Sequence, residues 1–220
     1  MIKKLHSPPS LAELAYEKIH QSILSGKLKC GEIYQEIGLA QQLGISRTPV
    51  REALLELSTR GFVTFLPRKG IRINRLSIQD IEEVFELRRV LEIYIVEKLA
   101  MAKNPYDLTE AKKILAKQNI ALQNNDSQTY ISTGRSFHIA LARLIQNSLF
   151  VSIQENIQDK IHIIALEAHS SPIRMQEAIH EHQIILEYIQ KGEKVKARKA
   201  MEQHLKSTFE TVVKQYMKNS

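Results

Sequence analysis

The sequence predicts a mostly α protein of two domains, in which three helices and a short two-stranded hairpin precede an all-helical bundle. Three observations support this prediction. The 220 residues are enough for one large or two small domains. Residues 1–76 hold 12 Lys and Arg against 6 Asp and Glu, so they carry +6 of the formal net charge of +7. Strand-type apolar runs occur only before residue 75, and helical periodicity fills the remainder.

The composition excludes several classes of protein. A hydrophobic share of 43% with 25% charged residues is typical of a globular chain and not of a disordered one. No apolar run approaches the roughly 18 residues that span a bilayer, and no signal-peptide core follows Lys3 and Lys4, so we expect no membrane partner. The single cysteine, Cys30, excludes a disulfide framework and a zinc ribbon, and the expected location is cytoplasmic.

The first two helices follow from apolar periodicity and from the residues that interrupt it. Ser10 can cap a helix that stops at Gly26. Its periodic apolar residues are Leu11, Leu14, Ala15, Ile19, Ile23 and Leu24. After a polar stretch over 27–32, a second segment is apolar-periodic until the break at 44–46. Its apolar residues are Ile37, Leu39, Ala40 and Leu43.

The third helix is expected to begin at Arg47, with Ser46 as its N-cap and Pro49 in its first turn, and to end at Gly61. Its expected buried face comprises Ala53, Leu54 and Leu57, with Leu55 as a further candidate. Two β-type runs over 62–65 and 71–73 follow, joined by a basic turn over 66–70. Three helices followed by a basic hairpin are typical of a winged helix-turn-helix.

Cations at the start of the third helix and at the tip of the hairpin suit DNA. The first residues of such a helix meet base edges, and the wing can reach a neighbouring groove or the backbone. The candidate DNA contacts are Arg47, Thr48, Arg51, Arg68, Lys69 and Gly70. The glycine is expected to let the turn approach DNA closely. The alternative is that these arginines only solvate a helical surface.

The second domain is expected to be a bundle of six helices. A DNA-binding domain over 1–74 and a linker over 75–77 precede it, and it covers 78–220. Ser77 can cap its first helix. Breaks rich in Asn, Ser, Pro and Gly separate helices over about 78–103, 107–123, 127–146, 149–169, 173–190 and 193–217.

Three of the eight histidines, His138, His182 and His204, lie on separate helices of this predicted bundle. Bundles build metal sites from imidazoles that project inward from different helices. His180 is two residues from His182, so the two cannot face the same interior. The remaining histidines, His6, His20, His162, His169 and His180, are interpreted as ordinary surface or core residues.

The segment LAQQLGISRTPVREALLELSTRGFV, followed by PRKGIRI, resembles the N-terminal domain of GntR-type bacterial transcription regulators. Residues 39–61 match the pattern of that family almost without a gap. The resemblance implies that Arg47, Thr48 and Arg51 contact double-stranded operator DNA and that Gly70 belongs to the wing.

Two residues depart from the GntR pattern. Cys30 stands where proline is usual, and we interpret it as a packed turn residue. Ile37 stands where a basic DNA-contacting residue is frequent, so that contact is not expected here.

Residues 77–217 resemble the FCD ligand-binding domain of the FadR subfamily, and the six-helix count is similar to its VanR-like version. The matching segments are VFELRRVLEIYIVEKLA, RSFHIALARLIQN and EAIHEHQIILEYIQKGEKVKARKAMEQHL. Metal-binding members use an Asp and a His four residues apart on one helix, and one His on each of the last two helices. The resemblance implies His138, His182 and His204 as metal ligands, whereas Gly134 stands at the aspartate position.

Three neutral imidazoles can still hold Zn²⁺ or Ni²⁺ with open positions for a ligand. Losing the aspartate should lower the metal affinity and make the site more positive by one charge. The alternative is that the three histidines are hydrogen-bonded to their surroundings and line a polar cavity without metal.

The segment Arg88-Arg89-Val90-Leu91-Glu92 is similar to the family's R-x-x-L-E, whose arginine points into the effector cavity. The resemblance implies that Arg88 points inward, where it could bind a small carboxylate effector bidentately, and that Arg89 points outward. The alternative is an exposed arginine pair that forms salt bridges with Glu92. The family also implies a homodimer, which would bind a pseudo-palindromic operator.

Together these features predict a ligand-responsive DNA-binding transcription regulator, with repression as the expected mode. One alternative is a metal-dependent enzyme that uses the three histidines to activate water. No acid or base lies at a recognisable spacing from them, however, and the DNA-binding domain would be unexplained. The other alternative is a DNA-binding protein with a purely structural bundle, in which inward polar groups would be costly.

Overall fold

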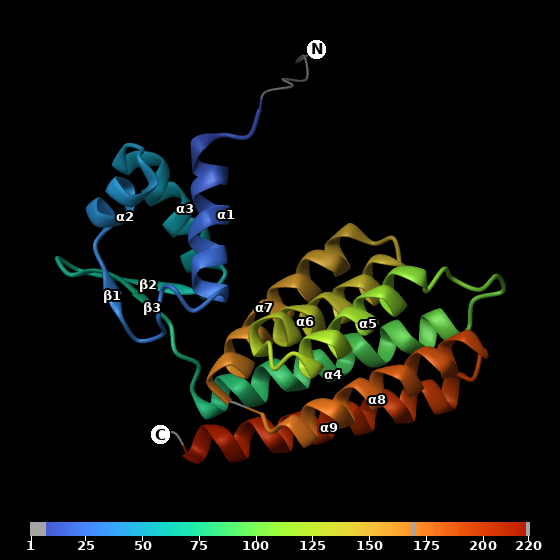
Figure 1. Cartoon of the computed structure of the whole chain (residues 1–220). Helices are drawn as coiled ribbons and strands as arrows, with labels where there is room; N and C mark the ends of the chain where they lie inside the picture. The colour runs from blue at the N-terminus through green and yellow to red at the C-terminus, as the bar shows by residue number, and fades with distance from the viewer. Residues whose placement is uncertain (1–7, 169, 219–220) are drawn as a thin grey trace, which may run out of the picture. The chain divides into compact units, whose positions relative to one another are not determined.

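The computed structural model describes residues 8–168 and 170–218. The chain divides into two compact units, the first ending at Arg75 and the second beginning at Leu76. Figure 1 shows the helices and strands of both units, with the chain coloured from blue at its start to red at its end.

Within its described residues the first unit contains three helices and a three-stranded antiparallel sheet (Figure 1). The elements are α1 (Leu11–Leu24), β1 (Ile33–Tyr34), α2 (Glu36–Leu43), α3 (Arg47–Thr59), β2 (Val63–Leu66) and β3 (Gly70–Ile73). The strand order is β1-β3-β2, with Ile33 opposite Arg72 and Val63 opposite Ile73. This architecture confirms the predicted winged helix-turn-helix.

Local signals fix the ends of these helices. At the start of α1, the Ser10 hydroxyl accepts a hydrogen bond from the Glu13 amide, and the Glu13 carboxylate accepts one from the Ser10 amide. At the end of α2, Gly44 adopts the left-handed conformation with φ of 67°. Helix α1 packs on α3, and the core between them includes Ile19 and Leu54.

Three details of the first unit differ from the sequence prediction. Leu55 is 50% exposed and so lies outside the core. Ser46 is the N-cap residue of α3, but its side chain makes no capping hydrogen bond. Strand β1 was not predicted, because two residues are too few to show the alternation that identifies a strand.

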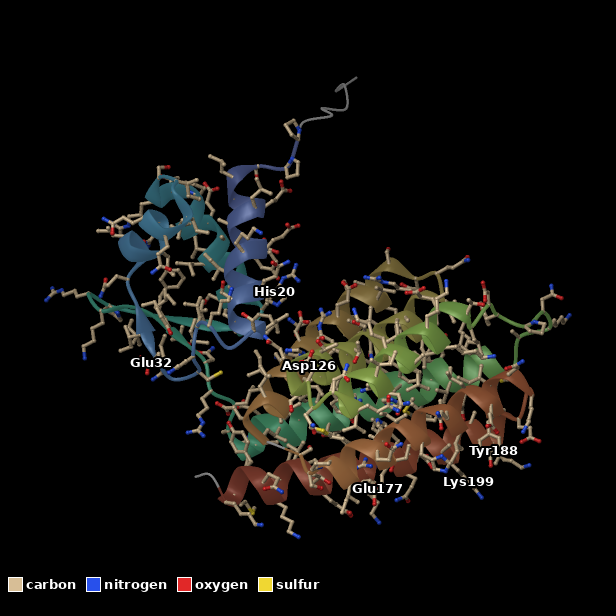
Figure 2. The ribbon with its side chains drawn as sticks, viewed as in Figure 1. His20, Glu32, Asp126, Glu177, Tyr188 and Lys199 are labelled. Atoms are coloured by element: carbon tan, nitrogen blue, oxygen red, sulfur yellow. The ribbon has the colours of Figure 1, made fainter. Side chains whose placement is uncertain are left out.

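The second unit, within its described residues, is made of six helices and no strands, as predicted (Figure 1). They are α4 (Ile78–Ala100), α5 (Thr109–Gln123), α6 (Ser127–Arg143), α7 (Ser148–Ala168), α8 (Pro172–Gln190) and α9 (Lys194–Lys218). Ser77, Asp126 and Ser171 cap α4, α6 and α8 through their side chains. Asp126 is labelled in Figure 2, together with the exposed Glu177 of α8 and Lys199 of α9.

Two apolar clusters fill this bundle. The larger one includes Ile95, Phe137 and Ile185, and the smaller one includes Ile81 and Phe85. Along α4 a buried polar pair separates the two clusters, since Arg88 and Glu92 follow Phe85 and precede Ile95. The bundle therefore encloses charged groups in the middle of its apolar interior. None of its described helices is long and apolar enough to cross a membrane.

Candidate functional site

The start of α3 exposes the cations that the sequence assigned to DNA. The side chains of Arg47 and Arg51 are 57% and 52% exposed, and Thr48 is exposed beside them. They lie on the first turns of the helix, where backbone N–H groups also favour a phosphate. Ile37 on α2 is 57% exposed, so an apolar side chain stands where a cation is frequent in the family.

Both arginines share one carboxylate, which the sequence analysis did not identify. Nε of Arg47 donates to Oε2 of Glu36 at 2.8 Å, and Nη1 of Arg51 donates to Oε1 at 2.9 Å. Burial raises the pKa of Glu36, but the hydrogen bonds and charges of the two arginines outweigh it, so the pKa lies below its ordinary value. Glu36 therefore holds the two guanidinium groups side by side at the start of α3.

The wing between β2 and β3 carries exposed Arg68 and Lys69. Its position is fixed from α2, because Nε2 of Gln35 donates to the Lys69 carbonyl at 2.8 Å. Gly70 has φ of 102°, and a Cβ atom there would collide with the carbonyl oxygen of Tyr34 on β1. A glycine is therefore required at position 70 because β1 passes close to it. The sequence had suggested a different reason, that the glycine lets the turn approach DNA.

The buried polar centre of the second unit is formed by several helices. Arg88 and Glu92 come from α4, His138 from α6, His182 from α8 and His204 from α9. Each of these five side chains is at most 4% exposed. The three histidines lie together, and each offers one ring nitrogen within 4.8 Å of the others. The structure thus brings together the three histidines singled out in the sequence.

Glu92 is the most strongly held group of this centre. Its Oε1 accepts hydrogen bonds from Nε of Arg88 at 2.7 Å and from the amides of Gln158 at 2.6 Å and Gln154 at 3.2 Å. Its Oε2 lies 2.8 Å from Nδ1 of His138. Burial raises its pKa, but the charges of Arg88 and His138 more than offset that, so the pKa lies well below its ordinary value and Glu92 is ionised.

The partners of His138 fix its tautomer. A guanidinium group can only donate hydrogen bonds, so the contact of Arg88 with Nε2 places the lone pair on Nε2 and the proton on Nδ1, beside the Glu92 carboxylate. Nη2 of Arg88 lies 2.9 Å from that Nε2 and donates to it. Burial lowers the pKa of His138, and Arg88 lowers it further against the opposing charge of Glu92, so the ring is neutral.

A second carboxylate fixes His204 in the same manner. Oε2 of Glu181 lies 2.7 Å from Nδ1 of His204, and Arg174 donates two hydrogen bonds to that carboxylate at 2.8 and 3.0 Å. The lone pair of His204 therefore lies on Nε2, 3.3 Å from Nε2 of His182. Burial, together with neighbouring positive charge, holds the pKa values of both rings well below the ordinary range.

This arrangement fits a divalent cation in most respects. The Nε2 atoms of His138 and His204 carry lone pairs, and a carboxylate supports the other ring nitrogen, as is usual for metal-binding histidines. Nε2 of His182 faces the lone pair of His204 and so carries the proton of its ring. That proton would need to move to Nδ1 before His182 could present a third lone pair. Arg88 competes for the lone pair of His138, and Gly134 supplies no carboxylate. The residues therefore fit a cation held by three neutral imidazoles and not the four-ligand set of the family.

A cavity of about 110 Å³ opens beside the histidines. His138, His182, His204, Gly134, Gln118, Arg135, Arg174 and His162 are among the residues that line it. Arg88 points inward and Arg89 outward, as expected, but Arg88 is not among the lining residues. Its salt bridge with Glu92, which was the alternative interpretation, is also present, inside the bundle and not on its surface.

Several residues of this centre were missed in the sequence. Glu92 and Glu181 look like ordinary helix surface charges, and Gln118 belongs to a different helix from the histidines. His162 was interpreted as an ordinary residue, yet it is buried and lines the cavity. His180 is exposed and His20 half-buried, while His6 and His169 lie outside the described residues.

A winged helix-turn-helix followed by an all-helical domain is an architecture of DNA-binding transcription regulators. The comparisons agree: residues 83–207 match the FCD domain, and residues 11–73 match the bacterial regulatory proteins of the gntR family. The chain belongs to the GntR family of transcription regulators and carries an FCD domain, as in the FadR subfamily.

Its relatives are transcription regulators and not enzymes. The chain is 32% identical to the Uxu operon regulator of Haemophilus influenzae, over 86% of this chain and 77% of that one. It is 28% identical to the gluconate operon transcriptional repressor of Bacillus licheniformis, over 89% and 80% of the two chains. It is also 28% identical to the regulator YdhC of Bacillus subtilis, over 94% and 91%.

Solved structures share the fold. Escherichia coli McbR/YncC superimposes with a TM-score of 0.83 at 23% identity, covering 95% of this chain and all of the other. A GntR regulator from Rhodococcus gives a TM-score of 0.84 at 18% identity, covering 93% and 98%. The metal-free FCD domain of another regulator gives a TM-score of 0.53 at 21% identity, covering 66% and 99%.

Proposed function

We propose that this regulator is a homodimeric repressor whose FCD domain binds a small organic acid at a divalent cation held by three histidines. One observation carries the proposal. The ring nitrogens of His138, His182 and His204 converge within 4.8 Å, inside the bundle and beside a cavity. Repression is proposed because relatives are named repressors. Since a regulator must reach its operator DNA, we expect the protein to act in the cytoplasm.

The proposed DNA contacts are those at the start of α3 and at the wing. Arg47, Thr48 and Arg51 would meet base edges and phosphates in the major groove. Arg68 and Lys69 would contact the backbone or an adjacent groove. The exposure of these side chains and the shared carboxylate of Glu36 support this assignment.

His138, His182 and His204 would hold the cation, with Zn²⁺ or Ni²⁺ as the ions that suit imidazole ligands. When bound, such an ion supplies a positive centre with open coordination positions for an anionic ligand. Glu92 and Glu181 keep the Nδ1 protons in place on two of the rings. The neutral state of all three rings at pH 7 makes them available as ligands.

The effector should be small. A cavity of about 150 Å³ holds a molecule the size of benzene, so 110 Å³ suits an acid of two to about four carbon atoms. A six-carbon sugar acid would require the helices to move apart. Arg174 also lines this cavity, where it is paired with the Glu181 carboxylate.

Arg88 remains the proposed effector-binding arginine, although it lies behind His138. Nη1 of Arg88 is buried and has no hydrogen-bond partner among the described residues. Its Nη2 donates to the Nε2 atom that a cation would take. A cation at His138 would therefore leave the Nη1 and Nη2 edge of Arg88 available, and that edge matches a carboxylate bidentately.

An apolar stripe on α4 supports dimerisation through the FCD domain. Leu87, Val90 and Tyr94 are 44%, 62% and 48% exposed, and their spacing places them along one side of the helix. Leu149 and Ile153 on α7 are 70% and 41% exposed. We propose that these residues form the interface, and that effector binding changes how a dimer presents its two DNA-binding domains.

Operator binding and its response to ligands test this function. Duplexes selected from a random-sequence library would be bound by the full chain, and the affinity measured with added Zn²⁺ and a panel of acids of two to six carbons. We expect a pseudo-palindromic selected sequence and weaker binding in the presence of one small acid. Selection of no common sequence would refute operator binding, and an affinity unaffected by every acid and by Zn²⁺ would refute the sensing role.

A further inference from the structure

The side chain of Gln118 on α5 lies against Gly134 on α6. Gln118 is 1% exposed. A Cβ atom built on Gly134 would lie only 2.8 Å from Nε2 of Gln118, closer than real Cβ contacts. Gly134 is four residues before His138, so the two positions share one face of α6. The carboxamide of Gln118 therefore lies where a side chain at position 134 would begin.

The two polar atoms of the Gln118 side chain differ in their hydrogen bonding. Its Nε2 donates a long hydrogen bond of 3.3 Å to the carbonyl of Tyr130. Its Oε1 is buried and accepts no hydrogen bond from the described residues. A buried carbonyl oxygen that accepts no hydrogen bond leaves its desolvation cost uncompensated. The same side chain lines the cavity together with the three histidines.

We propose that Gln118 replaces the aspartate ligand that Gly134 lacks, and that its carboxamide oxygen contacts a divalent cation held by His138, His182 and His204. This inference rests on the proposed metal site. The terminal torsion of glutamine is broad, so a rotation can exchange the positions of Oε1 and Nε2. That rotation gives up the long bond to the Tyr130 carbonyl and turns Oε1 toward that carbonyl oxygen, a cost that the contact with the cation has to exceed.

The proposal also accounts for a glycine inside a helix. Glycine in a helix interior is destabilising relative to alanine. At position 134 any Cβ would push against the buried carboxamide of Gln118. The glycine and the glutamine are therefore a matched pair, in which one residue makes the space that the other fills.

Exchanging a carboxylate for a carboxamide changes the charge of the site. Three imidazoles and an amide oxygen are all neutral, so the full charge of a divalent cation would remain for an anionic effector. A carboxylate ligand would cancel half of it. The pair of Gly134 and Gln118 thus favours an acid effector over a neutral one.

Cobalt binding to the chelator-treated full chain tests this role. Co²⁺ affinity would be measured by calorimetry and the ligand set by its visible absorption spectrum. We expect Q118A to weaken binding by about tenfold and Q118E, which keeps the size and adds a charge, to strengthen it by about tenfold. Both should alter the spectrum. The matched control, Q123E, changes an exposed glutamine on the same helix and should alter neither.

A double variant tests whether the fourth metal ligand lies beside position 134. G134D alone introduces an aspartate against Gln118 and should gain little affinity, whereas G134D combined with Q118A should bind Co²⁺ more tightly than either single variant. Thermal unfolding and helical content would be recorded for each protein, and Q118A, which adds no buried charge, is the variant expected to keep the fold without metal.

The outcomes separate the two proposals. A wild-type chain that binds Co²⁺ and loses it in His182→Ala, but whose affinity and spectrum are unchanged by Q118A and Q118E, would overturn the role of Gln118 and leave the metal site intact. A wild-type chain that binds no Co²⁺ would overturn the metal site itself and this inference with it.

Discussion

Nη2 of Arg88 lies 2.9 Å from Nε2 of His138, so a guanidinium group takes the lone pair that a metal ion would need. The same arginine forms the ion pair that neutralises buried Glu92. Arg88 is therefore both a competitor of a cation at His138 and the countercharge of the carboxylate behind that ring.

Replacing Arg88 by methionine should expose this double role. Removing one partner of a buried ion pair typically costs about 3–5 kcal/mol, because the other charge stays buried. A cation on Nε2 of His138 would partly replace the lost charge and would no longer meet a competitor. We therefore expect R88M to be much less stable than the wild type with EDTA, and to gain more stability from Zn²⁺.

Chemical denaturation with EDTA and with Zn²⁺ measures both effects. The matched control is Arg89→Met, which removes an exposed arginine next in the chain and should change neither value. A Zn²⁺-dependent stabilisation of R88M no greater than that of the wild type would contradict the competition.

Arg51→Ala should weaken binding to a selected operator duplex. A base or phosphate contact from this position is worth about 1–3 kcal/mol, and loss of a phosphate contact also lowers the salt dependence of binding. Fluorescence anisotropy at several salt concentrations gives both quantities. Arg60→Ala is the control, because Arg60 caps the far end of α3, where it pairs with Glu56. Equal losses in the two variants would argue against the assigned surface.

The carboxyl of Glu36 should titrate below its ordinary pKa, and NMR can follow it directly. In a variant with both Arg47 and Arg51 changed to alanine, burial remains but the two hydrogen bonds are gone, so the pKa should rise. Because the folded pKa is the lower one, the stabilising contribution is present above the unfolded value of 4.5 and is lost as the pH falls below it. Half-exposed arginines limit it to about 1 kcal/mol. An unchanged pKa in the double variant would show that the ion pairs do not form in solution.

Val90→Glu should convert the proposed dimer to a monomer. The change places a charge in the middle of the α4 stripe, at a position that is 62% exposed in the chain and so costs little in folding. Sedimentation velocity gives the mass directly. Ile173→Glu changes a residue that is 75% exposed on α8, a helix that contributes nothing to the proposed interface, and should leave the dimer unchanged. A dimer that persists in V90E would place the interface elsewhere.

Much of the fold could be predicted from the sequence, because its signals are local. Ser77 and Asp80 form a capping box within four residues, and Ser171 with Pro172 marks the start of α8 as clearly. The six helix positions of the bundle follow from such caps and from periodicity. Strand β1 could not be predicted, since its two residues become a strand only by pairing with β3.

Of the candidate site, only the three histidines proposed as metal ligands could be predicted from the sequence. The three histidines stand out by their type and by lying on separate helices, whereas the residues that orient them do not. Glu92 resembles a helical partner of Arg88, and its second role at His138 arises across 46 residues of sequence. The contact between Gln118 and Gly134 joins two helices, and nothing in the spacing of the chain indicates it.

If the histidine centre controls DNA binding, the effect of a small acid on operator affinity must depend on its histidines. The affinity of the full chain for its selected duplex would be measured after EDTA treatment, after addition of Zn²⁺, and with Zn²⁺ plus the small acids, for the wild type and for His204→Gln. We expect one acid to weaken the wild-type complex in the presence of Zn²⁺ and to have no effect on the variant. Equal responses of the two proteins would contradict it.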